Sequence, residues 1–152
     1  MKAALNNYTK SIALEPAEGK LYNAVYIRPM ATSRTKLGDQ GEQVAMRYLL
    51  THGYELIAHK WRCKNGEIDL ITRQQTELVF VEVRTRAGRA SPAESIDLRK
   101  QHKLIELAYT YTAQNSISPE TAWRIDVIAI NMDQHGNVLR LSHIRNAIEE
   151  KQ

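Results

Sequence analysis

Two carboxylates, Asp69 and Glu82, lie in apolar segments over residues 66–70 and 79–86, and both segments have the pattern of β-strands. Burying a carboxylate costs free energy unless a proton or a cation neutralises it. The short polar stretch between the two segments predicts that they form a hairpin. The chemistry of this hairpin therefore depends on what the two carboxylates face.

A hairpin that turns at Gln75–Thr76 would place Leu70 opposite Val81 and Asp69 opposite Glu82. The two acidic side chains would then have Cβ atoms roughly 4.5–5.5 Å apart, and their charges would repel. Such a pair is stable if one carboxyl is protonated or if a cation lies between them. Magnesium commonly takes one or two carboxylates and completes its shell with water and phosphate oxygens.

The same register places Glu67 opposite Arg84, two residues after Glu82. Two carboxylates with a nearby cation suit phosphodiester cleavage, because the carboxylates hold a metal that activates water and the cation steadies the phosphate. The alternative is purely structural. In it, Glu67 and Arg84 form a surface ion pair, and Asp69 lies beside Arg62.

Hydrophobic periodicity predicts the elements that position these residues. The second helix should bury Leu104, Leu107, Ala108 and Tyr111, and Asp39 with Glu42 forms a capping-box pattern at the start of the first. The expected elements are a helix over 39–52, strands over 55–62, 67–72 and 78–84, a helix over 97–113, and strands over 123–130 and 138–144. This order indicates an α/β domain with a mixed sheet.

We expect the domain to span residues 38–152, after an N-terminal extension over residues 1–37. Residues 21–27 could be a short strand or a docked arm, and the alternative is a disordered extension. Met30 begins a stretch that resembles a protein start. Residues 1–29 are therefore expected to be dispensable.

Composition is that of an ordinary globular protein, with a net charge of +4 and a pI near 9.2. A modest basic excess permits a nucleic-acid partner without demonstrating one. The single cysteine, Cys63, excludes an intrachain disulfide and favours a reducing compartment. There is no long apolar run and no secretory signal, so we expect a cytoplasmic protein without a membrane span.

Residues 66–71 (GEIDLI) and 79–86 (VFVEVRTR) closely resemble the UPF0102 (YraN-like) family. The resemblance covers roughly residues 38–145 and includes the segments 41–42, 100–104 and 124–128. That family is similar to the restriction-endonuclease-like PD-(D/E)XK superfamily, whose signature is an Asp followed by Glu-x-Lys on the next strand. The resemblance implies a restriction-endonuclease-like fold, with a mixed central sheet flanked by helices.

Residue by residue, the resemblance assigns Asp69 and Glu82 to the signature and Glu42 to the acidic position of the first helix. These three would bind Mg or Mn. The alternative for Glu42 is a first-turn carboxylate favoured by the helix dipole. Arg84 occupies the position of the signature lysine. Arginine stays charged and is a poor acid or base, so Arg84 could contact phosphate while the catalytic competence of the site is in question.

Three further residues could contact nucleic acid: Arg86, Gln101 and Lys103. Lys103 could also replace the missing ammonium group. The alternatives are a solvated basic face and a glutamine that bonds locally. The leading hypothesis is a nuclease-like protein acting on DNA, with branched or damaged structures as candidate substrates. One alternative is a catalytically inactive nucleic-acid-binding module of the same fold, and another is a protein-interaction domain in which these charges form only ion pairs.

Overall fold

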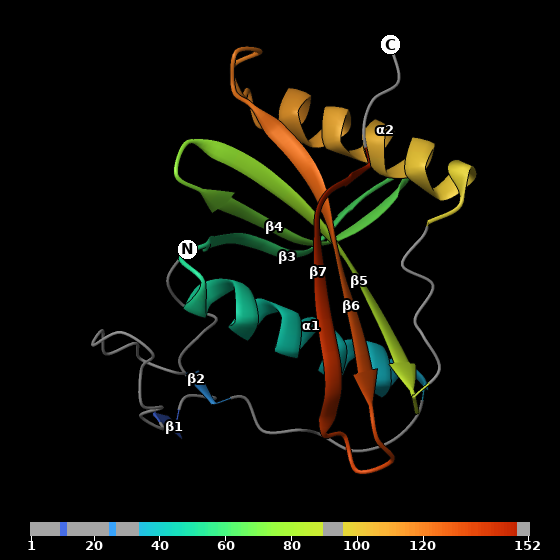
Figure 1. The fold of residues 1–152 in the computed structure, drawn as a ribbon. Helices are drawn as coiled ribbons and strands as arrows, with labels where there is room; N and C mark the ends of the chain where they lie inside the picture. The colour runs from blue at the N-terminus through green and yellow to red at the C-terminus, as the bar shows by residue number, and fades with distance from the viewer. Residues whose placement is uncertain (1–9, 12–24, 27–33, 90–95, 149–152) are drawn as a thin grey trace.

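The structure, a computed structural model, describes residues 10–11, 25–26, 34–89 and 96–148. Its elements are β1 (Lys10–Ser11), β2 (Val25–Tyr26), α1 (Arg34–Thr51), β3 (Glu55–Cys63), β4 (Gly66–Gln74), β5 (Glu77–Ala87), α2 (Leu98–Gln114), β6 (Trp123–Met132) and β7 (Val138–Ile148). Strands β3 to β7 form one sheet in chain order, and α1 and α2 cover its opposite faces (Figure 1). The predicted α/β fold, with a mixed sheet flanked by helices, is confirmed.

The sheet is mixed because one connection crosses over. Strands β3, β4 and β5 follow one another as antiparallel neighbours, and β7 returns antiparallel to β6. Strands β5 and β6 are parallel, and α2 lies between them in the chain. A parallel pair requires such a long connection, because the chain must return from the end of β5 to the start of β6.

Each face of the sheet has its own apolar core. Helix α2 buries Leu104, Leu107, Ala108 and Tyr111 against one face, which confirms the predicted stripe. On the other face α1 buries Ala45 and Leu49 against residues that include Val79 and Val81. Side chains alternate along β5, so Phe80 belongs to the α2 side. Position 82, two residues further on, shares that side.

The predicted start of the first helix is wrong. Helix α1 begins at Arg34 rather than at Asp39, so Asp39 lies inside the helix and does not cap it. The side chain of Asp39 instead pairs with Lys60. Gly53 follows the helix with a positive φ of 82°, as expected for a glycine that ends a helix. Within the described residues, neither helix has the length and apolarity needed to cross a membrane.

The strands are one to four residues longer than predicted at several ends, and the hairpin turn at Gln75–Thr76 is confirmed. Of the predicted extension, Lys10–Ser11 pairs antiparallel with Val25–Tyr26. Most of residues 1–33 lie outside the described residues. The expectation that residues 1–29 are dispensable therefore stays a prediction.

Candidate functional site

Strands β4 and β5 part beside Asp69. Their last ladder pair is Leu70 with Val81, as predicted. Beyond this pair the backbone N–H of Val83 donates a hydrogen bond of 2.8 Å to Asp69 Oδ2. The prediction that Asp69 and Glu82 face each other within the ladder is wrong, because the Asp69 carboxylate itself takes a backbone donor there.

Asp69 and Glu82 nevertheless share one electrostatic environment. Burial, followed by the charge of Glu82, raises the pKa of Asp69 to about 7, and Glu42 contributes in the same direction. Burial also raises the pKa of Glu82, although nearby cations partly offset the effect. The Glu82 side chain is only 13% exposed. The nearby cations therefore do not offset the cost of burying these two charges, and both carboxyl groups hold protons more tightly than carboxyl groups in water.

The cation bonded to Glu82 comes from α2. Lys100 Nζ lies 3.2 Å from Glu82 Oε1. Asp97 fixes this lysine at the helix start, because the Lys100 backbone N–H donates to Asp97 Oδ1 at 2.9 Å. The sequence indicates Lys100 as one of several basic residues that could contact a phosphate backbone, but it does not predict the pairing with Glu82. An N-capping Asp three residues before a lysine identifies the first turn of the helix, but the sequence does not show which strand that turn approaches.

Glu42 reaches the same region from α1 because the helix packs very closely on β5. A Cβ at Gly41 would lie 1.7 Å from Thr85 Oγ1, so only glycine fits there without displacement. Glu42 Oε2 is 2.7 Å from His59 Nε2 and 3.6 Å from Lys60 Nζ. Glu42 therefore lies close enough to influence Asp69, but its own carboxylate is engaged by residues of β3.

Arg84 lies two residues after Glu82 on β5, and its charge lowers the pKa of Glu82 less than Lys100 does. The β4–β5 ladder ends at Leu70 with Val81, short of Glu67 and Arg84, so the pairing of these two residues stays a prediction. Glu67 lies opposite Arg62 of β3, and Arg62 Nε donates to Glu67 Oε2 at 2.8 Å. The alternative that placed Arg62 beside Asp69 as its ion-pair partner is therefore not what the structure has.

The three outer residues predicted to contact nucleic acid have different surroundings. Arg86 is exposed near the end of β5. Gln101 Nε2 donates to the Ile96 carbonyl at 2.6 Å, which is the local role that the sequence analysis left open. Lys103 Nζ is 3.2 Å from Glu106 Oε2, so the ammonium group next to Glu82 belongs to Lys100 rather than to Lys103.

The chemistry of the donor set fits a hard divalent cation. Asp69 and Glu82 offer carboxylate oxygens, which Mg²⁺ and Mn²⁺ prefer, and their raised pKa values indicate that the nearby cations do not offset the burial of their charges. Among the described residues, no group of three His, Cys, Asp or Glu side chains is arranged to hold a metal. A magnesium-type ion can bind through two carboxylates and complete its shell with water, so this pair provides enough protein ligands.

A further carboxylate, Asp126, is fully buried on β6 and has several hydrogen-bond partners. His143 Nε2 lies 2.8 Å from its Oδ2, Arg124 Nε donates to its Oδ1 at 2.9 Å, and the Asn146 N–H donates to the same Oδ1 at 2.9 Å. Burial alone would raise the pKa of Asp126, but these partners together hold it below its usual value. The hydrogen bonds and the positive charge around Asp126 therefore outweigh the cost of burying its carboxylate.

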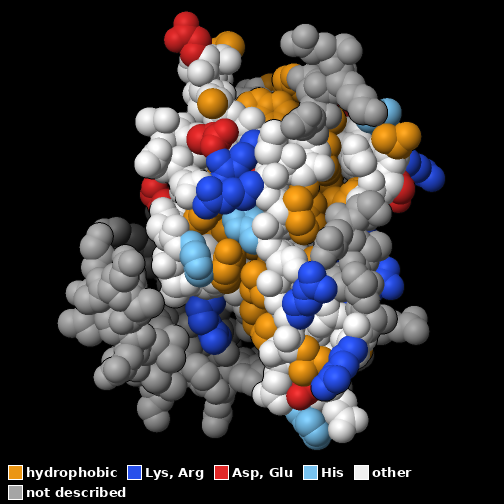
Figure 2. Space-filling view, in the orientation of Figure 1, with side chains coloured by type: hydrophobic (Ala, Val, Ile, Leu, Met, Phe, Trp, Pro, Cys, Tyr) orange, Lys and Arg blue, Asp and Glu red, His pale blue; other side chains and the backbone are white. Residues whose placement is uncertain are grey.

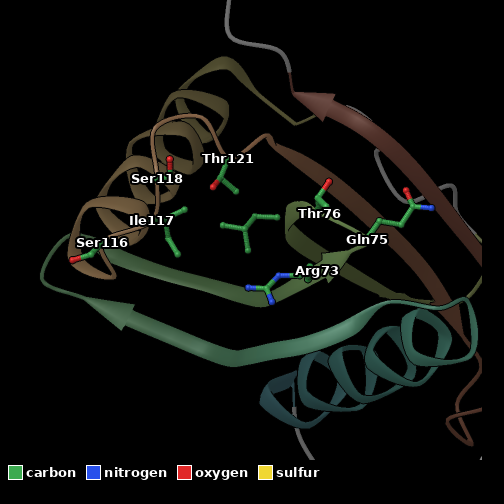
Figure 3. A pocket seen from close by; sticks show the side chains of 8 residues that line it. Arg73, Gln75, Thr76, Ser116, Ile117, Ser118 and Thr121 are labelled. Carbon is green, nitrogen blue, oxygen red and sulfur yellow. The ribbon is translucent and has the colours of Figure 1, made fainter.

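The shallow pocket shown in Figure 3 is remote from the acid pair. It lies between the β4–β5 turn and the segment that follows α2. Its lining includes Arg73 and Thr121 but no carboxylate, so it offers no metal ligands of the kind found at Asp69. On the molecular face seen in Figure 2, Lys and Arg side chains occupy separate places rather than one continuous basic patch.

One solved structure, titled "The structure of Pyrococcus Furiosus SfsA in complex with Ca2+", resembles this chain at a TM-score of 0.36 and 16% identity. The similarity covers 91% of this chain and 77% of that one. A likeness this distant says nothing about the chemistry of the site.

Sequence relatives are much closer. The profile described as "Uncharacterised protein family UPF0102" matches residues 41–130. A UPF0102 protein of Roseiflexus castenholzii is 46% identical and aligns with 80% of this chain and 99% of its own length. Its counterpart in Chloroflexus aurantiacus is 44% identical, with the same coverage of both chains. That of Desulforamulus reducens is 39% identical over 78% of this chain and 100% of its own. The chain therefore belongs to the UPF0102 family.

Proposed function

We propose that this protein is a metal-dependent nuclease-like protein that acts on DNA, with the PD-(D/E)XK superfamily as its wider group. The observation that carries the proposal is the undercompensated acid pair of Asp69 and Glu82, whose carboxyl pKa values are both raised. Perturbed carboxyl groups that gather from separate elements are typical of functional sites. The lysine bonded to Glu82 adds a cation suited to a phosphate.

Each residue has a role in this proposal. Asp69 and Glu82 hold Mg²⁺ or Mn²⁺, and Glu42 supports them from α1. When bound, the metal supplies water activation and positive charge at the phosphate. Arg84, two residues beyond Glu82 on β5, contacts a phosphate oxygen of the DNA. Arg86, which is exposed near the end of β5, is a second DNA contact in this proposal.

A second candidate function is a DNA-binding module that does not cleave. Position 84 favours it, because an arginine binds phosphate well but cannot readily lose a proton. Both candidates share DNA as the partner and differ in the fate of the phosphodiester bond.

The test uses the purified full chain with labelled linear, flapped and four-way DNA, in chelator, Mg²⁺ and Mn²⁺. The nuclease proposal expects strand cleavage that requires the metal and that Asp69→Asn abolishes. Salt-dependent DNA binding without cleavage would favour the inactive module. If neither binding nor cleavage occurs, and Mn²⁺ does not raise the melting temperature, both candidates are rejected.

A further inference from the structure

The acid pair has a cation that does not come from its own hairpin. Glu82 lies on β5, whereas Lys100 belongs to the first turn of α2, on the far side of the 90–95 connection. The ammonium nitrogen lies 3.2 Å from Glu82 Oε1, and its charge also lowers the pKa of Asp69. The charge of Lys100 therefore lowers the pKa of both carboxyl groups.

The two partners of this ion pair differ in their access to water. The Lys100 side chain is 42% exposed, while the Glu82 side chain is 13% exposed. The lysine therefore lies on the solvent side of the acid pair, where a phosphodiester would approach. Its backbone is fixed by the Asp97 cap, but its four-carbon side chain can still turn.

Lys100 and a divalent cation would compete for the same carboxylate. Like charges a few Å apart repel, so an ammonium group at Glu82 and a metal at Glu82 weaken each other. A metal that engages Glu82 would leave Lys100 without this partner, beside an anionic substrate. The flexible ammonium group is then placed to bond a phosphate oxygen.

We propose that Lys100 is the substrate-facing cation of this site, which pairs with Glu82 in the metal-free protein and turns to a phosphodiester oxygen when Glu82 is engaged by a divalent cation. This inference rests on the proposed function. It adds a phosphate contact from the first turn of α2 to the contact proposed for Arg84 on β5.

The first measurement is Mn²⁺ affinity, by calorimetry on the full chain, and it requires no catalytic activity. Lys100→Met keeps the backbone N–H that Asp97 caps and removes only the competing charge. We expect Lys100→Met to bind Mn²⁺ roughly fivefold more tightly than the wild type. Lys100→Arg, which keeps the charge, should return the affinity to the wild-type value. Unchanged or weaker Mn²⁺ binding by Lys100→Met would overturn the inference.

The second measurement is the single-turnover rate on whichever DNA the wild type cleaves. Lys100→Met should cleave about 100-fold more slowly in saturating Mn²⁺, a loss typical of removing one donor to a transition-state oxygen. Arg73→Met is the matched control, because it removes one exposed cation at the far end of β4. It should keep the wild-type rate. A Lys100→Met rate equal to that of this control would overturn the inference.

The outcomes separate the two proposals. If the wild type binds Mn²⁺ but cleaves no DNA, the nuclease activity fails, while the Mn²⁺ affinities still decide the role of Lys100. If the wild type binds no Mn²⁺, both proposals fail. Circular dichroism checks folding, and Lys100→Gln replaces Lys100→Met if the methionine variant does not fold.

Discussion

Among the described residues, the single carboxylate of Asp126 and the acid pair of Asp69 and Glu82 have opposite pKa shifts. At Asp126 three hydrogen-bond donors surround a fully buried carboxylate, and its pKa is held below the usual value. At Asp69 and Glu82, burial is the largest cause of the raised pKa values, and the nearby cations do not offset it. The partners of Asp126 thus offset the effect of its burial on its pKa, whereas the cations near Asp69 and Glu82 do not. An acid pair whose burial is not offset is the better candidate for binding a cation from solution.

The strongest test of this contrast is to remove the compensated charge. Asp126→Asn removes the buried carboxylate that Arg124 and His143 share, although Arg124 keeps its ion pair with Glu77. Breaking a buried ion pair from one side typically costs about 3–5 kcal/mol. Urea unfolding at pH 7 should show a loss of this size. Glu120→Gln, at an exposed position, should stay within about 0.5 kcal/mol of the wild type.

The opposite sign is expected at the acid pair. The pKa of Asp69 is raised from 3.8 to about 7, so the folded state binds a proton more tightly than the unfolded state. Stability is therefore lost as pH rises from about 4 to 7. In chelator at pH 8, Asp69→Asn should be more stable than the wild type by about 4 kcal/mol, and at pH 4 the two should be nearly equal. Equal pH profiles for the two proteins would contradict the assignment of an undercompensated pair.

Two glycines of α1 allow a test of how closely the helix packs on β5 near the site. Gly41→Ala would place a methyl group 1.7 Å from Thr85 Oγ1, and should destabilise the fold by about 2 kcal/mol. It should also move Glu42 away from the acid pair. Gly38→Ala is the control, since a Cβ there meets nothing within 4 Å. The control should gain up to about 1 kcal/mol from helix propensity. Thermal melts of both variants test this difference.

The smallest effect is expected for the ion pair of Arg62 and Glu67, whose side chains are 69% and 50% exposed. Solvent screens such pairs, which typically contribute less than 1 kcal/mol. Arg62→Gln should change the free energy of unfolding by no more than about 0.5 kcal/mol. A larger loss in urea unfolding would mean that charges on this edge of the sheet contribute to the fold.

Local sequence patterns predicted the elements well. The hairpin turn, the Leu70–Val81 pair and the buried stripe of α2 follow from periodicity and turn chemistry, which depend on neighbours in the chain. The start of α1 was mispredicted because Asp39 and Glu42 resemble a capping box. Their side chains instead pair with β3, 17 to 21 residues away. Pairings at this range leave no local signal.

The candidate site shows the same limit. Asp69 and Glu82 were identified because carboxylates are unusual in apolar strands, and no partner needs to be known for that inference. Lys100 is one of several lysines and arginines near the start of α2, and only the path of the crossover places it beside Glu82. The Asp126 cluster joins β6 and β7 through a bulged ladder, so its partners are equally hidden in the sequence.

The parallel pairing of β5 with β6 has a consequence for the order of folding. Residues of the β3–β4–β5 meander meet through short turns, whereas Glu82 and Val127 can pair only after the whole crossover has closed. Closing long loops slows folding, so we expect the meander to form early and the crossover late. The acid pair would then exist in a partly folded chain before Lys100 arrives. In pulsed hydrogen exchange, amides of β4 should gain protection before those of β6.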